Sequence, residues 1–480
     1  MIKTYITEKM SAPKRKRYKL SHFKGLNTTV AEENLPFRYS PKTYNFSFEK
    51  GVLAPGPGIE KGYVTVNGNR REIKKRNVTA KFLKFFRYTM HNLTDRLEKM
   101  VVYGDDGALY DITLNEEYSG FAYIGEYGEV YDAVSYRYDD RDGLLVSTST
   151  GLFFLRDFTM ESLSFGEVFS SLAVHNDRVF AVLALDEYKL YFSDDFNPSN
   201  WNVSLREGGY LDFGTDLGRI VKLVSFGGQL YIFFEHGIMR LSAYNDQTEF
   251  HLSRLYLSVG TISKGSVTIC GDRMMFASTE GIFEFDGLSV KKVMKEVDGI
   301  LSPDQTGAHA AFHGGKYYLA CRLDMGSAIA SGPNSLLIYD LWSQTFDVAH
   351  DLQLQAMVAL DLDSVTGVLA DANYPVDYLG LVKNVGKVDS TATYKLWESP
   401  VTALDATSGR KLLREIRVRC EGTATLKVEL DGKSYTYPLT DGLNKVRVMR
   451  AFDRVRVVLS SDAAEIKIVE AELTVDHFGE

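Results

Sequence analysis

A strand–turn–strand pattern recurs along the middle of this chain of 480 residues. The stretch GGQLYIFFEHGIMRLSA (227–243) is matched 44 residues later by GDRMMFASTEGIFEFDG (271–287), with glycines and apolar blocks in corresponding places. Within the first copy, Leu230–Phe234 is apolar on both sides of a period of two, so this strand must be covered on both faces. We therefore expect neighbouring copies of the pattern to cover one another.

Five further stretches carry the same pattern: Met100–Leu114, Gly143–Asp157, Arg178–Asp195, Lys316–Leu323 and Gly367–Gly380. The spacings run from roughly 37 to 53 residues. Periods of this size with several strands per unit are typical of a β-propeller, whose four-stranded blades bury their faces on one another. Seven copies are counted, and the first and last are degenerate. The sequence therefore predicts an all-β fold with a six- or seven-bladed β-propeller.

The two ends of the chain lack this repeat. Residues 1–75 are rich in Lys and Arg, and we expect them to form an extended basic N-terminal arm that crosses the propeller surface and supplies a closing strand. Residues 76–390 would hold the propeller itself. Residues 391–480 contain short strands in which apolar residues alternate with charges, and the turn signal Asp431–Gly432. They are predicted to form a C-terminal β-sandwich.

The net charge of −8 conceals a strong division along the chain. Residues 1–90 hold 20 Lys/Arg against six Glu, a net charge of +14, and the remainder carries −22. Such polarity points to partners of opposite sign at the two ends, although like charges scattered over different surfaces would give the same totals.

Nine basic residues are the candidate contacts: Lys14, Arg15, Lys16, Arg17, Arg70, Arg71, Lys74, Lys75 and Arg76. Docking to an acidic neighbouring protein is the favoured interpretation. The alternatives are a sequence-independent contact with the phosphates of double-stranded DNA and plain solvation.

No motif predicts catalysis, a cofactor or a metal, so we do not expect an enzyme. His309 and His313 would face one another only on a helix, and their surroundings are typical of a strand. The acids around Asp105–Asp106 and Asp139–Asp142 could serve glycoside hydrolysis, but they fall at hairpin tips, where Asp is favoured for turn geometry. SDDFNPSNW (193–201) has some likeness to the Asp-box of sialidases, and a structural corner with Trp201 packed inward is favoured.

The sequence also gives no sign of a membrane or disulfide-bonded protein. No apolar run approaches the length of a spanning helix, and the first ten residues lack the apolar core of a secretion signal. Three widely spaced cysteines predict a reducing compartment and no disulfide framework.

FKGLNTTVAEENLPFRYSPKTYNFSFEKGVLAPGPGI (23–59) resembles the opening of bacteriophage β-propeller neck and tail proteins. YFSDDFNPSNW (191–201), the paired copies in 227–287 and the C-terminal YKLWESPVT (394–402) are similar to other parts of that family. The nearest resemblance is to the packaged-DNA stabilisation (tail hub or head-closure) proteins of short-tailed phages.

The resemblance implies a structural virion protein, made in the bacterial host cytoplasm and placed in the neck or tail. It would form a homohexameric ring beneath the portal and adaptor, extend the DNA channel and retain the packaged genome until ejection. The family has no agreed catalytic residues to carry over. The alternative function is a glycan-binding or glycan-hydrolysing propeller, a tail adhesin, with carboxylates and aromatics at one end of the central channel.

Overall fold

The structure, a computed structural model, is almost entirely β, and its described part contains short 3-10 turns but no α-helix. It describes residues 13–66, 69–75, 78–91, 96–114, 119–163, 166–202, 208–243, 247–257, 260–362, 365–372, 377–405 and 410–478. The chain divides into two compact units. We call residues 60–345 and 351–382 the ring unit, and residues 13–59, 346–350 and 383–478 the two-sheet unit.

Within the described residues, the ring unit contains seven sheets of three or more strands and one two-stranded hairpin. Strands are given from the inside outwards. The first sheet contains β8 (Phe82–His91), β9 (Arg96–Gly104), β10 (Ala108–Leu114) and β11 (Ser119–Glu126), and the second contains β12 (Val130–Tyr138), β13 (Arg141–Thr148), β14 (Gly151–Arg156) and β15 (Thr159–Ser162). The third contains β16 (Phe169–His175), β17 (Arg178–Leu183), β18 (Lys189–Phe192) and β19 (Gly209–Asp212), and the fourth contains β20 (Ile220–Phe226), β21 (Gln229–Phe234), β22 (Gly237–Ser242) and β23 (His251–Leu257).

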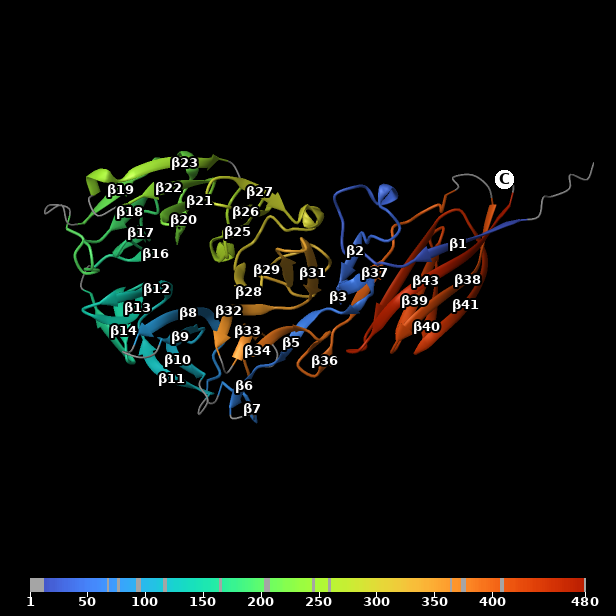
Figure 1. Cartoon of the computed structure of the whole chain (residues 1–480), viewed down its shortest axis with the longest axis horizontal. Helices are drawn as coiled ribbons and strands as arrows, with labels where there is room; N and C mark the ends of the chain where they lie inside the picture. The colour runs from blue at the N-terminus through green and yellow to red at the C-terminus, as the bar shows by residue number, and fades with distance from the viewer. Residues whose placement is uncertain are drawn as a thin grey trace, which may run out of the picture. The chain divides into compact units, whose positions relative to one another are not determined.

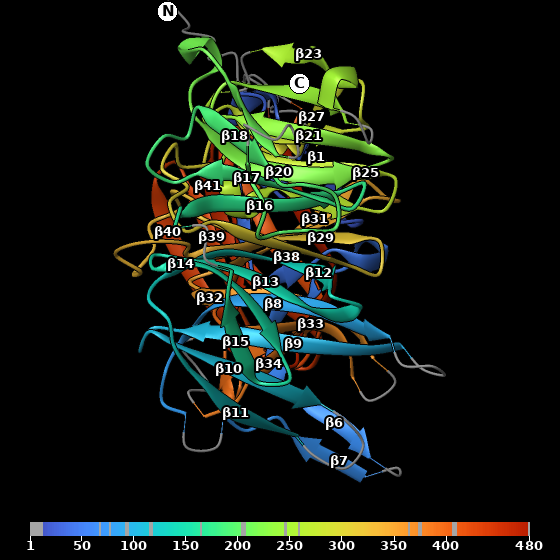
Figure 2. The ribbon, with the colours of Figure 1, turned by 90° about the vertical axis from the view of Figure 1, so that its left-hand side faces the viewer.

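The fifth sheet contains β24 (Thr268–Cys270), β25 (Arg273–Ser278), β26 (Gly281–Phe285) and β27 (Val290–Val293). The sixth contains β28 (His309–His313), β29 (Lys316–Cys321) and β30 (Ser335–Asp340), and the seventh contains β32 (Leu354–Leu362), β33 (Val365–Ala372) and β34 (Gly380–Asn384). The chain passes between the two units within β5 (Pro57–Lys61), β31 (Thr345–His350) and β34. The hairpin of β6 (Tyr63–Val66) and β7 (Asn69–Glu72) lies outside the ring of sheets (Figures 1 and 2).

The seven sheets follow one another around a common centre (Figure 1). Their first strands are innermost, and contacts join β8 to β12, β12 to β16, β16 to β20, β24 to β28, β28 to β32 and β32 back to β8. An apolar cluster joins the fourth sheet to the fifth. The all-β propeller fold predicted from the repeat is confirmed.

Strand β21 shows why the sequence is apolar on both sides of a strand. Leu230, Ile232 and Phe234 pack in a cluster shared with the third sheet, whereas Tyr231 and Phe233 pack in a cluster shared with the fifth. Both faces are therefore removed from water. Burial of apolar area stabilises a fold by about 25 cal/mol per Å², which makes this two-sided packing the main source of stability in the ring.

The repeated glycines have two different physical roles. Gly227 and Gly271, in the turns between the first and second strands of their sheets, have φ of 56° and 71°, a region that favours glycine. Gly237 differs, because a Cβ placed there would lie 2.6 Å from the carbonyl oxygen of Tyr256 on the neighbouring strand. Close approach of the neighbouring backbone is therefore the reason for glycine at this second turn.

The two-sheet unit consists of two antiparallel layers around one core. One layer has the order β1 (Lys14–Leu20), β43 (Lys467–Phe478), β38 (Arg410–Glu421) and β41 (Gly442–Phe452), and the other β2 (Lys42–Tyr44), β37 (Lys395–Glu398), β42 (Val455–Ser461), β39 (Ala424–Leu430) and β40 (Lys433–Leu439). Two short pairs accompany them, β3 (Phe46–Ser47) with β4 (Ala54–Pro55) and β35 (Lys387–Val388) with β36 (Thr391–Ala392). Leu413 and Leu473 from one layer share an apolar cluster with Trp397 and Val457 from the other.

The structure differs from the expected division into an arm, residues 76–390 and residues 391–480. The basic segment is a strand, β1, that pairs along its length with the C-terminal strand β43, and β2 pairs with β37. Only residues 60–75 of the expected arm belong to the ring unit, where the N–H of Gly62 donates to Leu379 O (2.8 Å) and Ile73 O accepts from Leu379 N–H (3.1 Å). Most of the arm is thus an integral layer of the C-terminal fold.

We predict that Leu20→Ala destabilises the two-sheet unit by about 2–5 kcal/mol, the usual cost of emptying a well-packed leucine site. Leu20 is 1% exposed and lies in the same apolar cluster as Trp397. Denaturant unfolding followed by Trp397 fluorescence, with Trp201 and Trp342 replaced by Phe, measures this unit. Lys14→Ala, at an exposed position of the same strand, is the control. Equal stability of the two variants would mean that β1 is a detachable arm.

Candidate functional site: the lysine-lined axial cavity

A β-bulge recurs near the start of the innermost strands of the ring. The pairing of five of these strands shifts by one residue at Phe82/Lys84, Val130/Asp132, Phe169/Ser171, Ile220/Lys222 and Leu354/Ala356. A bulge changes the direction of the side chains that follow it and is common beside binding sites. Here it brings charged side chains from apolar strands to the ring centre.

The carboxylate of Asp132 is the hub of a network that spans three sheets. Its Oδ2 atom accepts hydrogen bonds from the N–H of Leu172 (3.0 Å) and the hydroxyl of Ser171 (3.1 Å) in the third sheet. The Nζ atom of Lys222 in the fourth sheet lies 3.5 Å from the same oxygen. The side chain of Asp132 is 10% exposed, so this charge is held largely away from water.

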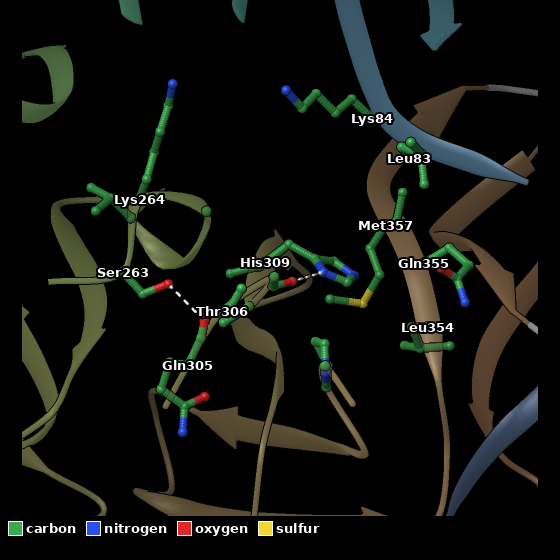
Figure 3. A pocket seen from close by; sticks show the side chains of 18 of the residues that line it. Leu83, Lys84, Ser263, Lys264, Gln305, Thr306, His309, Leu354, Gln355 and Met357 are labelled. Carbon is green, nitrogen blue, oxygen red and sulfur yellow. Dashed lines mark hydrogen bonds between the residues drawn. The ribbon is translucent and has the colours of Figure 1, made fainter. Parts of the chain in front are cut away.

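Two more lysines reach the same region. The ammonium of Lys84, on β8, donates to the carbonyls of Val130 (2.6 Å) and Tyr131 (3.2 Å). Lys264, in the 3-10 turn Lys264–Ser266 before β24, donates to Ser170 O. Lys84 and Lys264 extend to the same side of the cavity (Figure 3). Three sheets thus send one ammonium each toward the Asp132 network.

These residues line a cavity of about 1000 Å³ within the ring unit. It is bounded by the starts of inner strands and by the connections that lead into them. Its charged lining consists of four cations and two carboxylates: Lys84, Arg87, Lys222, Lys264, Asp132 and Asp304. The net charge of the lining is therefore positive.

Burial and neighbouring charges both shift the pKa values of the groups in this site. Burial lowers the pKa of Lys264 to about 8, and Asp132 only partly opposes that shift. Burial also lowers the pKa of Lys84. For Asp132, burial favours the neutral acid, but Lys222, Lys264 and the two hydrogen-bond donors from the third sheet outweigh it and hold the pKa below its usual value.

His309 lines the same cavity (Figure 3). Its Nδ1 atom lies 3.0 Å from Gly307 O, so that nitrogen carries the proton and donates. The Nε2 atom is buried without a hydrogen-bond partner among the described residues. Burial lowers the pKa of His309, which leaves Nε2 as an acceptor toward the cavity. His313 is four residues further along the same strand, β28.

The predicted contact residues Lys14, Arg15, Lys16 and Arg17 lie on the edge strand β1. The Nε atom of Arg15 is 2.9 Å from the Asp476 carboxylate, and Arg17 is 3.9 Å from Glu472. The basic strand therefore finds part of its acidic complement on β43 of the same unit. A row of cations on an edge strand also discourages pairing with other chains.

The second basic run has more varied surroundings. Arg70 and Arg71 are exposed on β7, and the Arg70 guanidinium lies 4.2 Å from the ring centre of Tyr63. Lys74 is 3.2 Å from a carboxylate oxygen of Glu72. Arg76 lies outside the described residues.

Lys75 is a correction to the predicted contact residues. Its side chain is 4% exposed, and its ammonium lies 2.6 Å from the carboxylate of Asp371, which is 1% exposed. Asp371 also accepts the N–H of Phe82 (2.6 Å). Burial raises the pKa of Asp371, and Lys75 opposes that shift. Lys75 is therefore part of the core and cannot reach a partner.

The acid pairs considered for glycoside hydrolysis have turn roles. Asp139 and Asp140 both adopt positive φ, 50° and 57°, at the two central positions of the β12–β13 hairpin. Asp105 Oδ1 accepts the N–H of Lys81 (2.9 Å), and Asp106 accepts that of Ala108 (3.1 Å). These contacts account for the acids through local backbone geometry.

Trp201 packs inward at a corner, as the corner interpretation of 193–201 predicts. The side chain is 4% exposed, its Nε1–H donates to Pro198 O (2.7 Å), and its ring stacks on Phe169 at 5.0 Å. In the part of the chain that the structure describes, no group of three or more His, Cys, Asp or Glu side chains is placed to hold a metal ion.

No protein-family model and no curated protein matches this chain. Solved structures that it is similar to include KlHsv2 with loop 6CD replaced by a Gly-Ser linker (8% identity, TM-score 0.33, covering 56% of this chain and 97% of that one). Others are YCF48 from Cyanidioschyzon merolae (8%, 0.33, 57% and 94%) and BBS1N in complex with ARL6DN (14%, 0.32, 53% and 75%). These likenesses carry no information on activity or partners. Among the described residues, no helix has the length and apolarity to cross a membrane.

For the buried pair, we predict that Lys75→Met destabilises the ring unit by about 3–5 kcal/mol, because it leaves the Asp371 carboxylate buried and uncompensated. Lys75→Met combined with Asp371→Asn should recover most of that loss, since the amide oxygen can still accept the N–H of Phe82. Denaturant unfolding followed by Trp201 fluorescence measures both variants. A Lys75→Met protein of unchanged stability would contradict a core role.

For Lys264, we predict that wild-type stability rises relative to Lys264→Met as the pH increases from 7 to 10. The folded pKa of about 8 lies below the ordinary value, so the unfolded chain binds more protons than the folded one between these two pKa values. Thermal unfolding at pH 7, 8.5 and 10 measures the difference. The control Lys295→Met, at an exposed position outside the cavity, should differ from wild type by a constant amount. The same constant offset for Lys264→Met would contradict the lowered pKa.

Proposed function

We propose that this chain is a structural virion protein that forms a ring of six copies in the neck or tail of a bacteriophage. In that position it extends the DNA channel and helps to retain the packaged genome until ejection. The proposal rests on the resemblance of residues 23–59 and 191–201 to phage neck and tail proteins. It rests equally on exposed apolar side chains that recur at equivalent turns of the propeller, and this is the observation that carries it.

The recurring side chains lie in the connections that follow the third strands of four sheets. They are Phe158 (49% exposed), Phe196 (66%), Leu288 (70%) and Trp342 (89%). Antiparallel hairpins alternate between the two ends of a sheet, so the third-to-fourth turns share one face of the ring with the first-to-second turns. Two contacts agree with this: the N–H of Phe196 donates to Asp177 O (3.0 Å), and the Trp342 indole lies over Gly315.

Hydrogen bonds and backbone conformation in these turns hold the side chains in exposed positions. In DGLS (286–289) and DLWS (340–343), the Asp carboxylate accepts the N–H groups two and three residues later, at 2.7 to 3.0 Å, and the residue two positions on is Leu288 or Trp342. Phe158 and Phe196 have φ of 65° and 58°, which is uncommon for bulky residues and accumulates at functional sites. Four such residues on one face favour contact with another protein surface.

A ring also needs contacts along its axis. Arg70 and Arg71 on the hairpin β6–β7 are exposed, whereas Lys75 is buried, so we assign this contact to the two arginines. An acidic surface on the portal, the adaptor or another neck protein is the proposed partner. Sequence-independent contact with DNA remains the alternative for these two arginines.

We predict that the combined change Leu288→Ser and Trp342→Ser lowers the mass of the assembly, because a standing ring buries thousands of Å² that cannot tolerate loss of its apolar centre. Native mass spectrometry should give six chains for the wild type and smaller species for the variant. The control is Leu185→Ser, which changes an equally exposed leucine (90%) in a second-to-third turn, at the opposite end of the sheets.

Cryo-electron microscopy of virions provides the decisive outcome. A symmetric ring on the channel axis is expected, and a single copy on the capsid exterior would overturn the proposal. A monomeric wild type with saturable binding on a glycan array would favour the propeller adhesin instead.

A further inference from the structure

We propose that the axial cavity is a binding site for a small phosphate-bearing anion, held by Lys84, Lys222 and Lys264. This inference concerns the ring unit alone and stands independently of the proposed virion role.

The first argument is the number of unused donors. Three ammonium groups carry nine N–H donors. Two from Lys84 go to Val130 O and Tyr131 O, one from Lys264 goes to Ser170 O, and one from Lys222 faces Asp132. Five donors are therefore left without a protein acceptor among the described residues. Polar groups in a partly buried site need partners, and a multivalent oxyanion supplies several acceptors at once.

The second argument is electrostatic. The lining carries four cations against two carboxylates, and three ammonium groups act electrostatically on one of these, Asp132, which already accepts from Ser171 and the Leu172 backbone. This carboxylate therefore compensates only part of the positive charge. Like charges held together in a partly desolvated site repel one another, and a bound dianion would remove that repulsion.

The third argument is the origin of the lysines. Lys84 and Lys222 are each the residue that follows a β-bulge, in the first and fourth sheets, and Lys264 comes from a connection in the fifth. Because the three come from different sheets and point to one region, only a closed ring assembles the site. A scattered set of solvent-facing lysines would not share a cavity of about 1000 Å³, a volume suited to one small ligand.

The lining also suggests how the remainder of the ligand is held. Thr306 and His309 supply neutral polar groups, and Leu354 and Met357 supply an apolar wall (Figure 3). His309 Nε2 is an acceptor without a partner among the described residues. A phosphate ester whose organic part carries hydroxyl groups matches this combination.

The test is isothermal titration calorimetry of the full chain at pH 7 with sodium pyrophosphate, with sodium acetate and with a duplex DNA as separate probes. We expect saturable pyrophosphate binding and at least tenfold weaker binding of acetate. Lys222→Met and Lys264→Met should each weaken pyrophosphate binding by about 10- to 100-fold, the range for a hydrogen bond to a charged group. Lys222→Arg keeps the charge and should retain binding within a few-fold.

Lys295→Met is the matched control, since it removes an exposed lysine outside the cavity and should leave binding unchanged. Thermal unfolding with and without pyrophosphate gives a second readout, because a ligand of the folded state raises the midpoint. This readout is also available for any variant of low stability. The proposal is overturned if pyrophosphate binding to the wild type does not saturate, or if both Met variants bind pyrophosphate as tightly as the wild type. Binding of duplex DNA alone, without binding of pyrophosphate, would also overturn it.

Discussion

In the ring unit, every sheet must cover the two sheets beside it. Strand β21 sends alternate side chains into two clusters, one shared with each neighbouring sheet, and β13 and β17 do the same in other pairs. Two faces buried in this way leave only the ends of the sheets for polar chemistry. The turns carry the Asp, Gly and exposed apolar residues, and the starts of the inner strands carry the lysines. The location of each candidate site thus follows from the packing.

The fold class could be predicted because two-sided apolar strands and turn residues are local signals. The partnership of the two chain ends could not, because β1 and β43 lie more than 400 residues apart and the pairing leaves no local mark. The charge division was informative but ambiguous. Opposite charges at the two ends of the chain are compatible both with a contact to another molecule and with a pair of strands inside one unit. The ion pair of Arg15 with Asp476 joins two strands of one unit. The sequence does not distinguish Lys75 from its exposed neighbours, because its partner Asp371 lies 296 residues further along the chain, on β33.

The lysine-lined cavity was missed for a related reason. Lys84 and Lys222 each follow two apolar residues, in FLK (82–84) and IVK (220–222). A single cation in such a place usually marks the solvent-exposed end of a strand. Their convergence depends on bulges at matching positions and on closure of the ring. A weak signal exists: a charged residue at the same place in several copies of an apolar strand. Aligning the copies by their inner strands, instead of by their glycine turns, would have revealed it.

The two ends of the ring differ in chemistry for a reason built into antiparallel hairpins. The first-to-second and third-to-fourth turns emerge at one end, which carries Phe158, Leu288 and Trp342, and the inner strands begin at the other, where Lys84 and Lys222 lie. Such a unit has an apolar face and a positively charged mouth. Association of copies through the apolar face, as proposed, would leave the mouths accessible, because the two features lie at opposite ends. Assembly and anion binding can thus be altered by separate substitutions, and a change in one does not require a change in the other.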